Sequence, residues 1–158
     1  MQNLQEKHRM DDRIKEAKLK ALSLLNYMDR TEAGLRQKLK EKSFDDKSID
    51  EAIEYVKSFG YINDEGYAER YILNRHGSKS QREIYASLIQ KGISREDIEL
   101  AMEHCFVEDD ELITIQRLCE KKHFVAEEAT DVEKKRMYQY LLRKGFRRED
   151  VCKVLNVQ

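Results

Sequence analysis

The sequence contains no proline and no tryptophan, and only six of its 158 residues are glycine. Proline is the strongest helix breaker, so its absence leaves glycine and capping residues to separate one helix from the next. β-Branched residues are sparse and nowhere alternate with polar residues over the length of a strand, so no β-sheet is expected. These absences together predict an all-α protein.

Three cysteines, an odd number at wide spacing, do not form the pattern of a disulfide framework. Such usage is typical of a reducing compartment, so we expect a cytoplasmic protein. No apolar run approaches the roughly 20 residues that cross a bilayer, and the polar N-terminus does not resemble a signal peptide. We therefore expect no membrane partner.

Motifs that carry catalysis are also missing. There is no glycine-rich phosphate loop, nucleophile elbow or paired-histidine metal motif, so no catalytic residue is predicted. A four-ligand zinc set could be assembled from His104, Cys105, Cys119 and His123, but zinc templates use close cysteine pairs and these cysteines are far apart. The adjacent carboxylates of Asp109 and Asp110 precede a helical stripe and are interpreted as helix caps. We predict no enzyme, no cofactor and no metal site.

What the sequence does contain is one short pattern, written three times. Each copy has a leucine, a lysine three residues later, then glycine or serine, then phenylalanine or isoleucine: Leu39–Phe44, Leu88–Ile93 and Leu141–Phe146. Apolar residues lie four positions before each leucine and again beyond each turn. A spacing of four places residues on one helix face, so every copy predicts a helix, a tight turn with a glycine C-cap, and a second helix.

Apolar stripes extend each copy to three helices, starting with a stripe from Leu4 to Met28. We predict a flexible segment at 1–10 and three-helix repeats at 11–60, 61–107 and 108–158. Helices this short are marginal alone and must be stabilised by packing their stripes together. The predicted fold is therefore three tandem three-helix repeats in an elongated or curved row. Such arrays present a long surface to a partner, which is typical of a binding protein, here expected to be a monomer.

Short polar residues mark the helix starts. The expected N-caps are Thr31, Asp45, Asn63 or Asp64, Ser80 and Ser94. Ser80 is followed by Glu83, and Ser94 by Asp97, at the spacing of a capping box. The turn at Ser43 lacks the glycine of the other two copies, so we expect a strained or differently shaped C-cap there.

The net charge is only −1, although 39% of the residues are charged. This near balance excludes a generic polyanion binder, but the charges are segregated: acids dominate 96–111 and bases dominate 134–158. Lysines in a last helical turn are favoured by the helix dipole without any function. Arg143, Arg147 and Arg148 crowd like charges around one turn, which favours a facing anion or acidic partner. The candidate binding residues are Arg70, Arg75, Lys79, Arg82, Lys91, Arg143, Lys144, Arg147 and Arg148.

Four segments together resemble the RecX family of regulators of the RecA recombinase. They are Arg30–Leu39, the Gly-Tyr-Ile-Asn-Asp block that opens Gly60–Ala68, the Lys-Gly-Ile turn that ends Ile84–Ile93, and the turn Lys144–Phe146. The resemblance covers about 20–155. The chain departs from the family pattern at two positions, with Gly34 where the family tends to have a capping-box glutamate and Ser80 where it tends to have glycine. Losing the glutamate should weaken the helix start at Thr31.

The resemblance implies a function. RecX-like proteins bind the RecA nucleoprotein filament, lie along its helical groove across successive subunits, and suppress strand exchange, ATP hydrolysis and coprotease activity. It therefore implies a mainly inhibitory regulator of RecA in homologous recombination, DNA repair and the SOS response. The implied partners are the RecA filament and single- or double-stranded DNA.

A different class of protein also fits the repeated turn. Each Lys-Gly turn joins two helices as the turn of a DNA-binding helix-turn-helix motif does. A dedicated duplex reader normally has a strongly basic domain, and here only the second and third repeats carry basic clusters. Direct action on DNA is the alternative to RecA regulation.

Overall fold

The computed structural model describes residues 1–158 except for the side chain of Gln2, and over this part of the chain it contains nine helices and no strand. The helices are α1 (Gln2–Tyr27), α2 (Glu32–Glu41), α3 (Asp46–Ser58), α4 (Asp64–Arg75), α5 (Gln81–Gln90), α6 (Arg95–Cys105), α7 (Asp110–Lys121), α8 (Asp131–Arg143) and α9 (Arg148–Leu155). About 73% of the residues are helical. The all-α prediction is confirmed.

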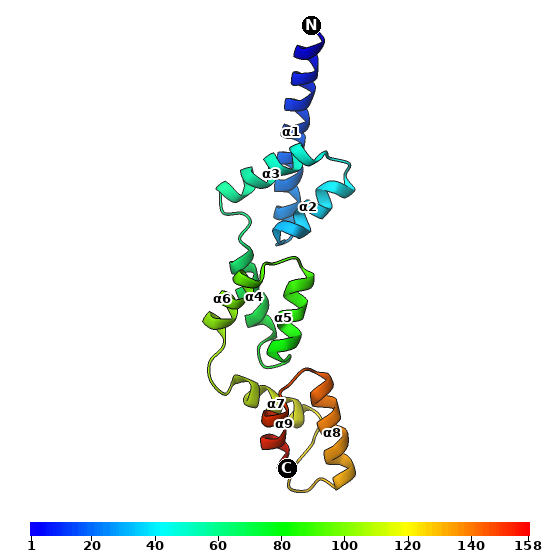
Figure 1. Ribbon diagram of the computed structural model, residues 1–158, viewed down its shortest axis with the longest axis vertical. Coiled ribbons are helices and arrows are strands. Elements are labelled where there is room, and N and C mark those ends of the chain that lie inside the picture. The colour runs from blue at the N-terminus through cyan, green and yellow to red at the C-terminus, as the bar shows by residue number, and fades with distance from the viewer.

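The helices form three units that follow one another along a rod, with the two chain ends at opposite tips (Figure 1). Repeat 1 contains α1–α3, repeat 2 contains α4–α6 and repeat 3 contains α7–α9. The predicted elongated array of three-helix repeats is thus confirmed. The exact limits proposed for the repeats stay a prediction, as does flexibility at 1–10, where α1 already begins at Gln2.

Each repeat has its own apolar core. The core of repeat 1 is built on Leu35, Leu39, Ile49, Ile53 and Val56; that of repeat 2 on Ile72, Ile84, Leu88 and Ile98; and that of repeat 3 on Ile115, Met137, Leu141, Val151 and Leu155. Apart from Val56, Ile72 and Ile115, these are the apolar positions that flank the repeated turns in the sequence. The stripes therefore stabilise units rather than one common core, as in other repeat proteins.

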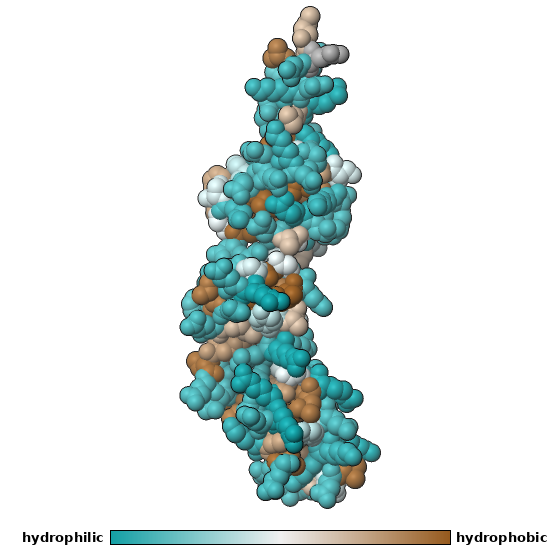
Figure 2. Space-filling view, viewed as in Figure 1, coloured by the Kyte–Doolittle hydropathy of each residue, from teal (hydrophilic) through white to brown (hydrophobic). Residues whose placement is uncertain are grey.

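The N-terminal half of α1 projects beyond repeat 1 (Figure 1). Ala17 and Ala21 are fully buried, whereas Leu4 and Met10, which belong to the same predicted stripe, are exposed. The stripe was therefore wrong as a guide to burial at its start, because the shorter α2 and α3 do not reach that part of α1. Hydrophilic residues cover most of the face in Figure 2, and apolar residues form small separate patches on it. Among the described residues, no helix is long and apolar enough to cross a membrane.

Most of the predicted caps are present. Thr31, Asp45, Asn63, Ser80 and Ser94 each accept a hydrogen bond from the backbone N–H three residues later. Thr31 thus caps α2 without the glutamate partner that Gly34 replaces.

One capping prediction was wrong and one cap was missed. Asp109 precedes α7 in a left-handed conformation and caps nothing with its side chain. A complete capping box joins Thr130 and Glu133 at the start of α8. The Thr-x-x-Glu spacing is visible in the sequence, but Thr130 was not among the expected caps.

The repeated turn has one conformation throughout. In all three copies the N–H of the apolar residue after the turn is bonded to the carbonyl of the motif's leucine, and the intervening residue has positive φ: 61° at Ser43, 79° at Gly92 and 91° at Gly145. Serine is strained in this region, as predicted, because its Cβ crowds the backbone. The same hydrogen bond across a residue of positive φ recurs at Gly60, His123 and Asn156. There the N–H groups of Tyr61, Phe124 and Val157 donate to the carbonyls of Val56, Cys119 and Cys152.

Candidate functional site

The repeats are joined through the repeated turn. The hydroxyl of Thr31, at the start of α2, donates to the carbonyl of Lys91 in the turn of repeat 2, at 2.9 Å. In the same way the hydroxyl of Ser80, at the start of α5, donates to the carbonyl of Lys144 in repeat 3, at 2.6 Å. Both hydroxyls also cap their own helices. Each N-cap residue therefore serves two repeats at once.

A carboxylate reinforces each junction. The backbone N–H of Glu32 donates to Asp64 at 2.9 Å, and the N–H of Gln81 donates to Glu111 at 2.6 Å. In both cases the carboxylate lies at the start of one repeat. It accepts a hydrogen bond from the first N–H of the second helix in the preceding repeat. Burial raises the pKa of both carboxyls, against the lowering effect of these hydrogen bonds. The site is favourable for an anion because a helix N-terminus carries partial positive charge.

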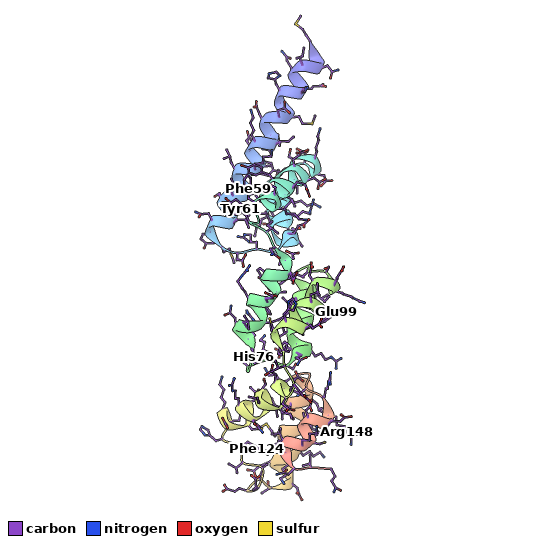
Figure 3. The ribbon with its side chains drawn as sticks, turned by 90° about the vertical axis from the view of Figure 1, so that its left-hand side faces the viewer. Phe59, Tyr61, His76, Glu99, Phe124 and Arg148 are labelled. Atoms are coloured by element: carbon purple, nitrogen blue, oxygen red, sulfur yellow. The ribbon has the colours of Figure 1, made fainter. Side chains whose placement is uncertain are left out.

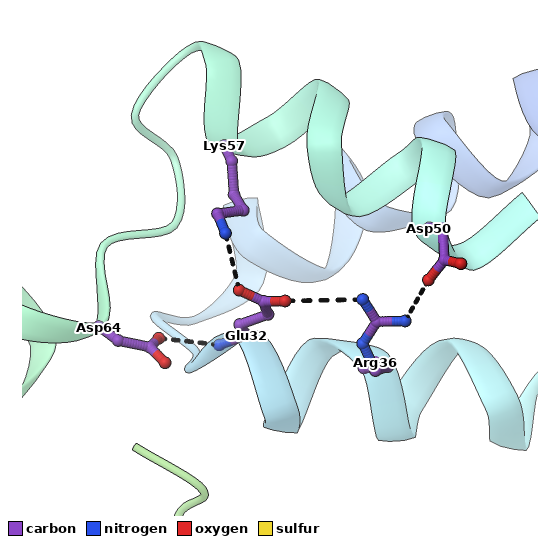
Figure 4. Close-up of polar contacts among 5 residues, drawn as sticks. All are labelled: Glu32, Arg36, Asp50, Lys57 and Asp64. Atoms are coloured by element: carbon purple, nitrogen blue, oxygen red, sulfur yellow. Dashed lines mark hydrogen bonds and ion pairs between the residues drawn. The ribbon is translucent and has the colours of Figure 1, made fainter. Parts of the chain in front are cut away.

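An ion-pair network surrounds the first junction (Figure 4). The carboxylate of Glu32 lies 3.0 Å from the ammonium of Lys57 and 3.5 Å from the guanidinium of Arg36, which also pairs with Asp50. The network connects α2 with α3, while Asp64 binds the backbone of Glu32 from repeat 2. The side chains are partly exposed, so each pair contributes only about 0 to 1 kcal/mol.

The turn glycines allow the repeats to approach closely. A Cβ atom on Gly92 would lie 2.4 Å from the Cβ atom of Ala33, and one on Gly145 would lie 3.0 Å from the hydroxyl of Ser80. Within the described structure the turn at Ser43 docks on no other repeat, and the carbonyl of Ser43 accepts a hydrogen bond from Arg13 of α1. This explains why the first copy of the pattern tolerates serine.

A hollow of about 450 Å³ lies at the junction between repeats 2 and 3. We call it the arginine groove. Its basic residues are Arg82 from α5 and Arg147 and Arg148 from the start of α9, and its apolar residues include Tyr85 and Met102. These three arginines belong to two basic clusters far apart in the sequence. No ion pair forms at any of the three within the described part of the chain.

Two helix N-termini contribute to the arginine groove besides the arginines. α5 begins at Gln81 and α9 at Arg148, both of which line it. Figure 3 shows Arg148 directed outward from repeat 3. Glu111 of α7 also lines the groove, and one of its carboxylate oxygens accepts a hydrogen bond from the N–H of Gln81. Arginine forks together with helix N-termini can bind phosphate or carboxylate groups.

The structure disperses the other predicted binding residues. Arg70 is held by Asp29 of repeat 1 at 2.7 Å, and Lys79 by Glu83 at 3.3 Å. Both Arg75 and Lys91 lie over the ring of Tyr71, at 3.6 and 5.5 Å from its centroid.

Two further predicted residues, Arg143 and Lys144, do not line the arginine groove. Lys144 lies 5.9 Å from the centroid of the Tyr140 ring. Arg143 is exposed at the end of α8. Tyr85 and Met102 were not predicted as site residues, although Tyr85 lies three positions after Arg82 on the same helix. That spacing was the only available signal for Tyr85, and nothing in the sequence indicated Met102.

A buried carboxylate lies close to the groove. Asp110 accepts a hydrogen bond from the N–H of Val107 at 2.7 Å, and its Oδ2 lies 3.0 Å from Nε2 of His76. The His76 contact is close, although Nε2 of the ring makes no aligned hydrogen bond. Burial tends to raise the pKa of Asp110, but the Val107 N–H and His76 together lower it below its ordinary value. The ionised form therefore stabilises the connection between α6 and α7.

We expect Asp110→Asn to lower the free energy of unfolding by about 1 kcal/mol at neutral pH, because a neutral acceptor replaces a charged one. A carboxyl with a depressed pKa stabilises the fold above its unfolded pKa, ordinarily 3.8, and this contribution is lost as pH falls through the folded value. The difference between variant and parent should shrink in acid. Urea denaturation of variant and parent at neutral and at acidic pH measures this difference in the free energy of unfolding. Asp109→Asn is the matched control, and an equal loss in both variants would contradict the role of Asp110.

Side chains that could hold a metal gather at one place in repeat 2. Glu65, Glu69 and His104 bring one ligand atom each to within 4.8 Å of one another. His104 is exposed and lies 3.0 Å from Glu69, whose hydrogen bond raises the pKa of the imidazole. An ion pair accounts for this arrangement.

The zinc set considered from the sequence does not assemble, because Cys105 packs in repeat 2 and Cys119 lies in the core of repeat 3.

Comparison with known families matches all three repeats. The family models for the first, second and third three-helix domains of RecX match 17–55, 63–102 and 108–155. Solved structures support the same fold: the crystal structure of RecX from Lactobacillus salivarius has a TM-score of 0.76 at 23% identity, covering 92% of this chain and 96% of that one. A crystal structure of a regulatory protein RecX has a TM-score of 0.84 at 22% identity, covering 99% of this chain and 77% of that one.

Curated relatives are similar over most of the sequence. Regulatory protein RecX of Caldanaerobacter subterraneus subsp. tengcongensis is 35% identical over 144 residues, which cover 90% of this chain and 71% of the relative. Regulatory protein RecX of Clostridium perfringens strain SM101 is 36% identical over 139 residues, covering 86% of this chain and 65% of the relative. The chain thus spans about two thirds of the length of these relatives. It belongs to the RecX family of regulatory proteins.

Proposed function

We propose that this protein regulates RecA, mainly as an inhibitor, by binding along the groove of the RecA–DNA filament. The observation that carries the proposal is the arrangement of three separately cored repeats in one elongated row. A filament presents the same protomer surface at regular intervals, and a row of linked units can contact several protomers at once. Linked contacts raise the overall affinity above that of any single contact.

The distribution of charge supports a partner made of both protein and nucleic acid. The exposed face of α6 carries Glu96, Glu99 and Glu103, whereas the arginine groove is lined by three arginines and one carboxylate, that of Glu111. Segregated charge orients a protein on its partner and disfavours wrong alignments. The groove of a nucleoprotein filament exposes protein together with phosphate. Binding there would obstruct incoming duplex or favour a filament state poor in ATP hydrolysis.

Direct reading of duplex DNA by a helix-turn-helix motif is less well supported. The third helix of each repeat would be the one to enter a major groove. In repeats 1 and 2 this helix is acidic on its exposed side, with Glu51 and Glu54 on α3 and Glu99 and Glu103 on α6. Phosphates would repel both helices. Comparing affinity for bare duplex with affinity for RecA-coated DNA separates the two functions.

ATP hydrolysis by RecA on single-stranded DNA tests the proposal. We expect hydrolysis by RecA of the same organism to fall when this protein is added below the RecA concentration, because one elongated molecule would affect several protomers. Coprotease activity and strand exchange should fall in parallel. Denatured protein at the same concentration is the control. Unchanged hydrolysis at equimolar protein would contradict RecA regulation whatever the fold.

A further inference from the structure

The two junctions of the array share one architecture, but two of its positions carry arginine only at the second junction. Thr31 and Ser80 are equivalent N-caps, so Arg82 of the second junction occupies the place of Ala33 in the first. Lys91 and Lys144 are equivalent turn residues, so Arg147 occupies the place of Ser94, and Arg148 that of Arg95. Two arginines therefore replace small residues at the second junction only. The first junction serves as an internal reference for what the architecture itself requires.

The start of α9 differs from its counterpart α6. At the first junction the hydroxyl of Ser94 accepts the N–H of Asp97 and caps α6. At the second junction Arg147 occupies the cap position and its side chain makes no capping bond. The N–H groups of the first turn of α9 thus have no protein acceptor among the described residues. Such N–H groups bind water when they are exposed, and an anion is a favourable replacement for that water.

The three arginines also favour an anion at this place. Arg82, Arg147 and Arg148 line one hollow without an acidic partner within ion-pair distance. Asp150, which is also near, has a 4.0 Å contact with Lys153 instead. Like charges held together are mutually repulsive unless an anion lies between them. Arginine forks match the geometry of phosphate oxygens.

The apolar side of the groove distinguishes a nucleotide from a simple anion. Tyr85 lies beside Arg82 on α5 and is partly exposed, and Met102 and Phe146 complete this side. Aromatic surface next to a cationic track is the combination by which proteins hold single strands, with bases stacked and phosphates paired. An acidic peptide would use the arginines but leave the apolar surface uncovered. A paired duplex would hide its base faces from Tyr85.

We propose that the arginine groove binds a nucleotide unit of single-stranded nucleic acid, with its phosphate between the arginines and the start of α9 and its base against Tyr85. The hollow of about 450 Å³ is within the usual size of ligand sites. Because Arg82 belongs to repeat 2 and the other arginines to repeat 3, the bound phosphate bridges the two repeats. The inference rests on the proposed function only in that a RecA filament exposes such a strand.

Titration of a fluorescently labelled oligothymidine without RecA tests the proposal, so its failure is distinguishable from failure of RecA regulation. We expect Arg148→Glu to weaken binding about tenfold or more, because a charged hydrogen bond is replaced by repulsion. The log-log slope of affinity against salt should flatten by about 0.7 for each phosphate that the variant no longer neutralises. Arg95→Glu makes the same charge change at the equivalent place in the first junction, and should leave affinity nearly unchanged.

A second variant separates binding from folding. Arg147→Ser gives α9 the residue that caps α6, so we expect a higher thermal midpoint together with weaker binding of the oligonucleotide. Opposite changes in stability and affinity cannot come from misfolding. Tyr85→Leu should weaken binding of the strand but not of inorganic pyrophosphate. Equal losses for Arg148→Glu and Arg95→Glu, or equal competition by polyglutamate and oligothymidine, would overturn the proposal. So would binding of duplex as tight as that of the single strand.

Discussion

Gly92→Ala is expected to lower the free energy of unfolding by about 2–4 kcal/mol, more than most single substitutions. Two costs combine at this position. The backbone is left-handed, with φ of 79°, which costs an L-residue about 1–2 kcal/mol. The new methyl group would also lie 2.4 Å from the Cβ atom of Ala33 in the preceding repeat. Overpacking of this kind costs about 1–3 kcal/mol, or pushes the repeats apart.

Gly60→Ala is the matched control for this prediction. Gly60 has a similar φ of 71°, but a Cβ atom there would meet no neighbour within 4 Å. Its replacement should therefore cost only about 1 kcal/mol, the strain without the clash. Urea denaturation followed by circular dichroism gives both values, and small-angle X-ray scattering would detect a changed angle between the repeats in Gly92→Ala. Equal destabilisation by the two substitutions would contradict the close junction.

The helices were predictable because their causes are local. Apolar spacing, short polar caps and turn glycines act within a few residues of one another, and all three repeats follow from them. The strain at Ser43 was also predictable from the turn alone. Asp109 shows the limit of this reasoning, because a carboxylate before a helix can cap only if its backbone is extended, and here the backbone is left-handed.

The junctions were not predictable because their partners are far apart in the chain. Thr31 and Lys91 are 60 residues apart, and Ser80 and Lys144 are 64. A serine or threonine before a helix indicates only a cap, and nothing in its neighbourhood specifies a second acceptor. The glycine of the Lys-Gly turn likewise predicts positive φ, which many turns need. Its second role becomes visible only with the preceding repeat in place.

The candidate site was predictable in part for the same reason. Charge crowding around Gly145 identified Arg147 and Arg148, but could not indicate that Arg82 would join them. Nor could it separate Arg82 from Arg70, which Asp29 of repeat 1 neutralises across the other junction. The sequence shows which residues are charged and where they lie along the chain. Which charges remain unpaired depends on how the repeats are docked.

The combined variant Arg143→Glu, Arg147→Glu and Arg148→Glu should weaken binding to RecA filaments and to bare single-stranded DNA by about a hundredfold or more. Three attractive charges become repulsive at one edge of repeat 3, and the electrostatic contribution to nucleic-acid affinity is large. The fold should survive, because the three side chains are exposed and form no ion pair within the described structure. Exposed charges of this kind contribute only about 0 to 1 kcal/mol each to stability.

Measurement of this variant needs helicity, affinity and salt dependence together. Unchanged circular dichroism would establish that the repeats are intact, and the log-log salt slope on single strands should flatten by roughly 2 if all three arginines contact phosphate. Lys40, Lys42 and Lys47 lie exposed around the corresponding turn of repeat 1, so their replacement by glutamate makes the same change in net charge at a turn without an arginine groove. If both triple variants lose affinity equally, net charge rather than this site governs binding. If the arginine variant binds filaments and DNA as the parent does, the cluster is only a solvated face.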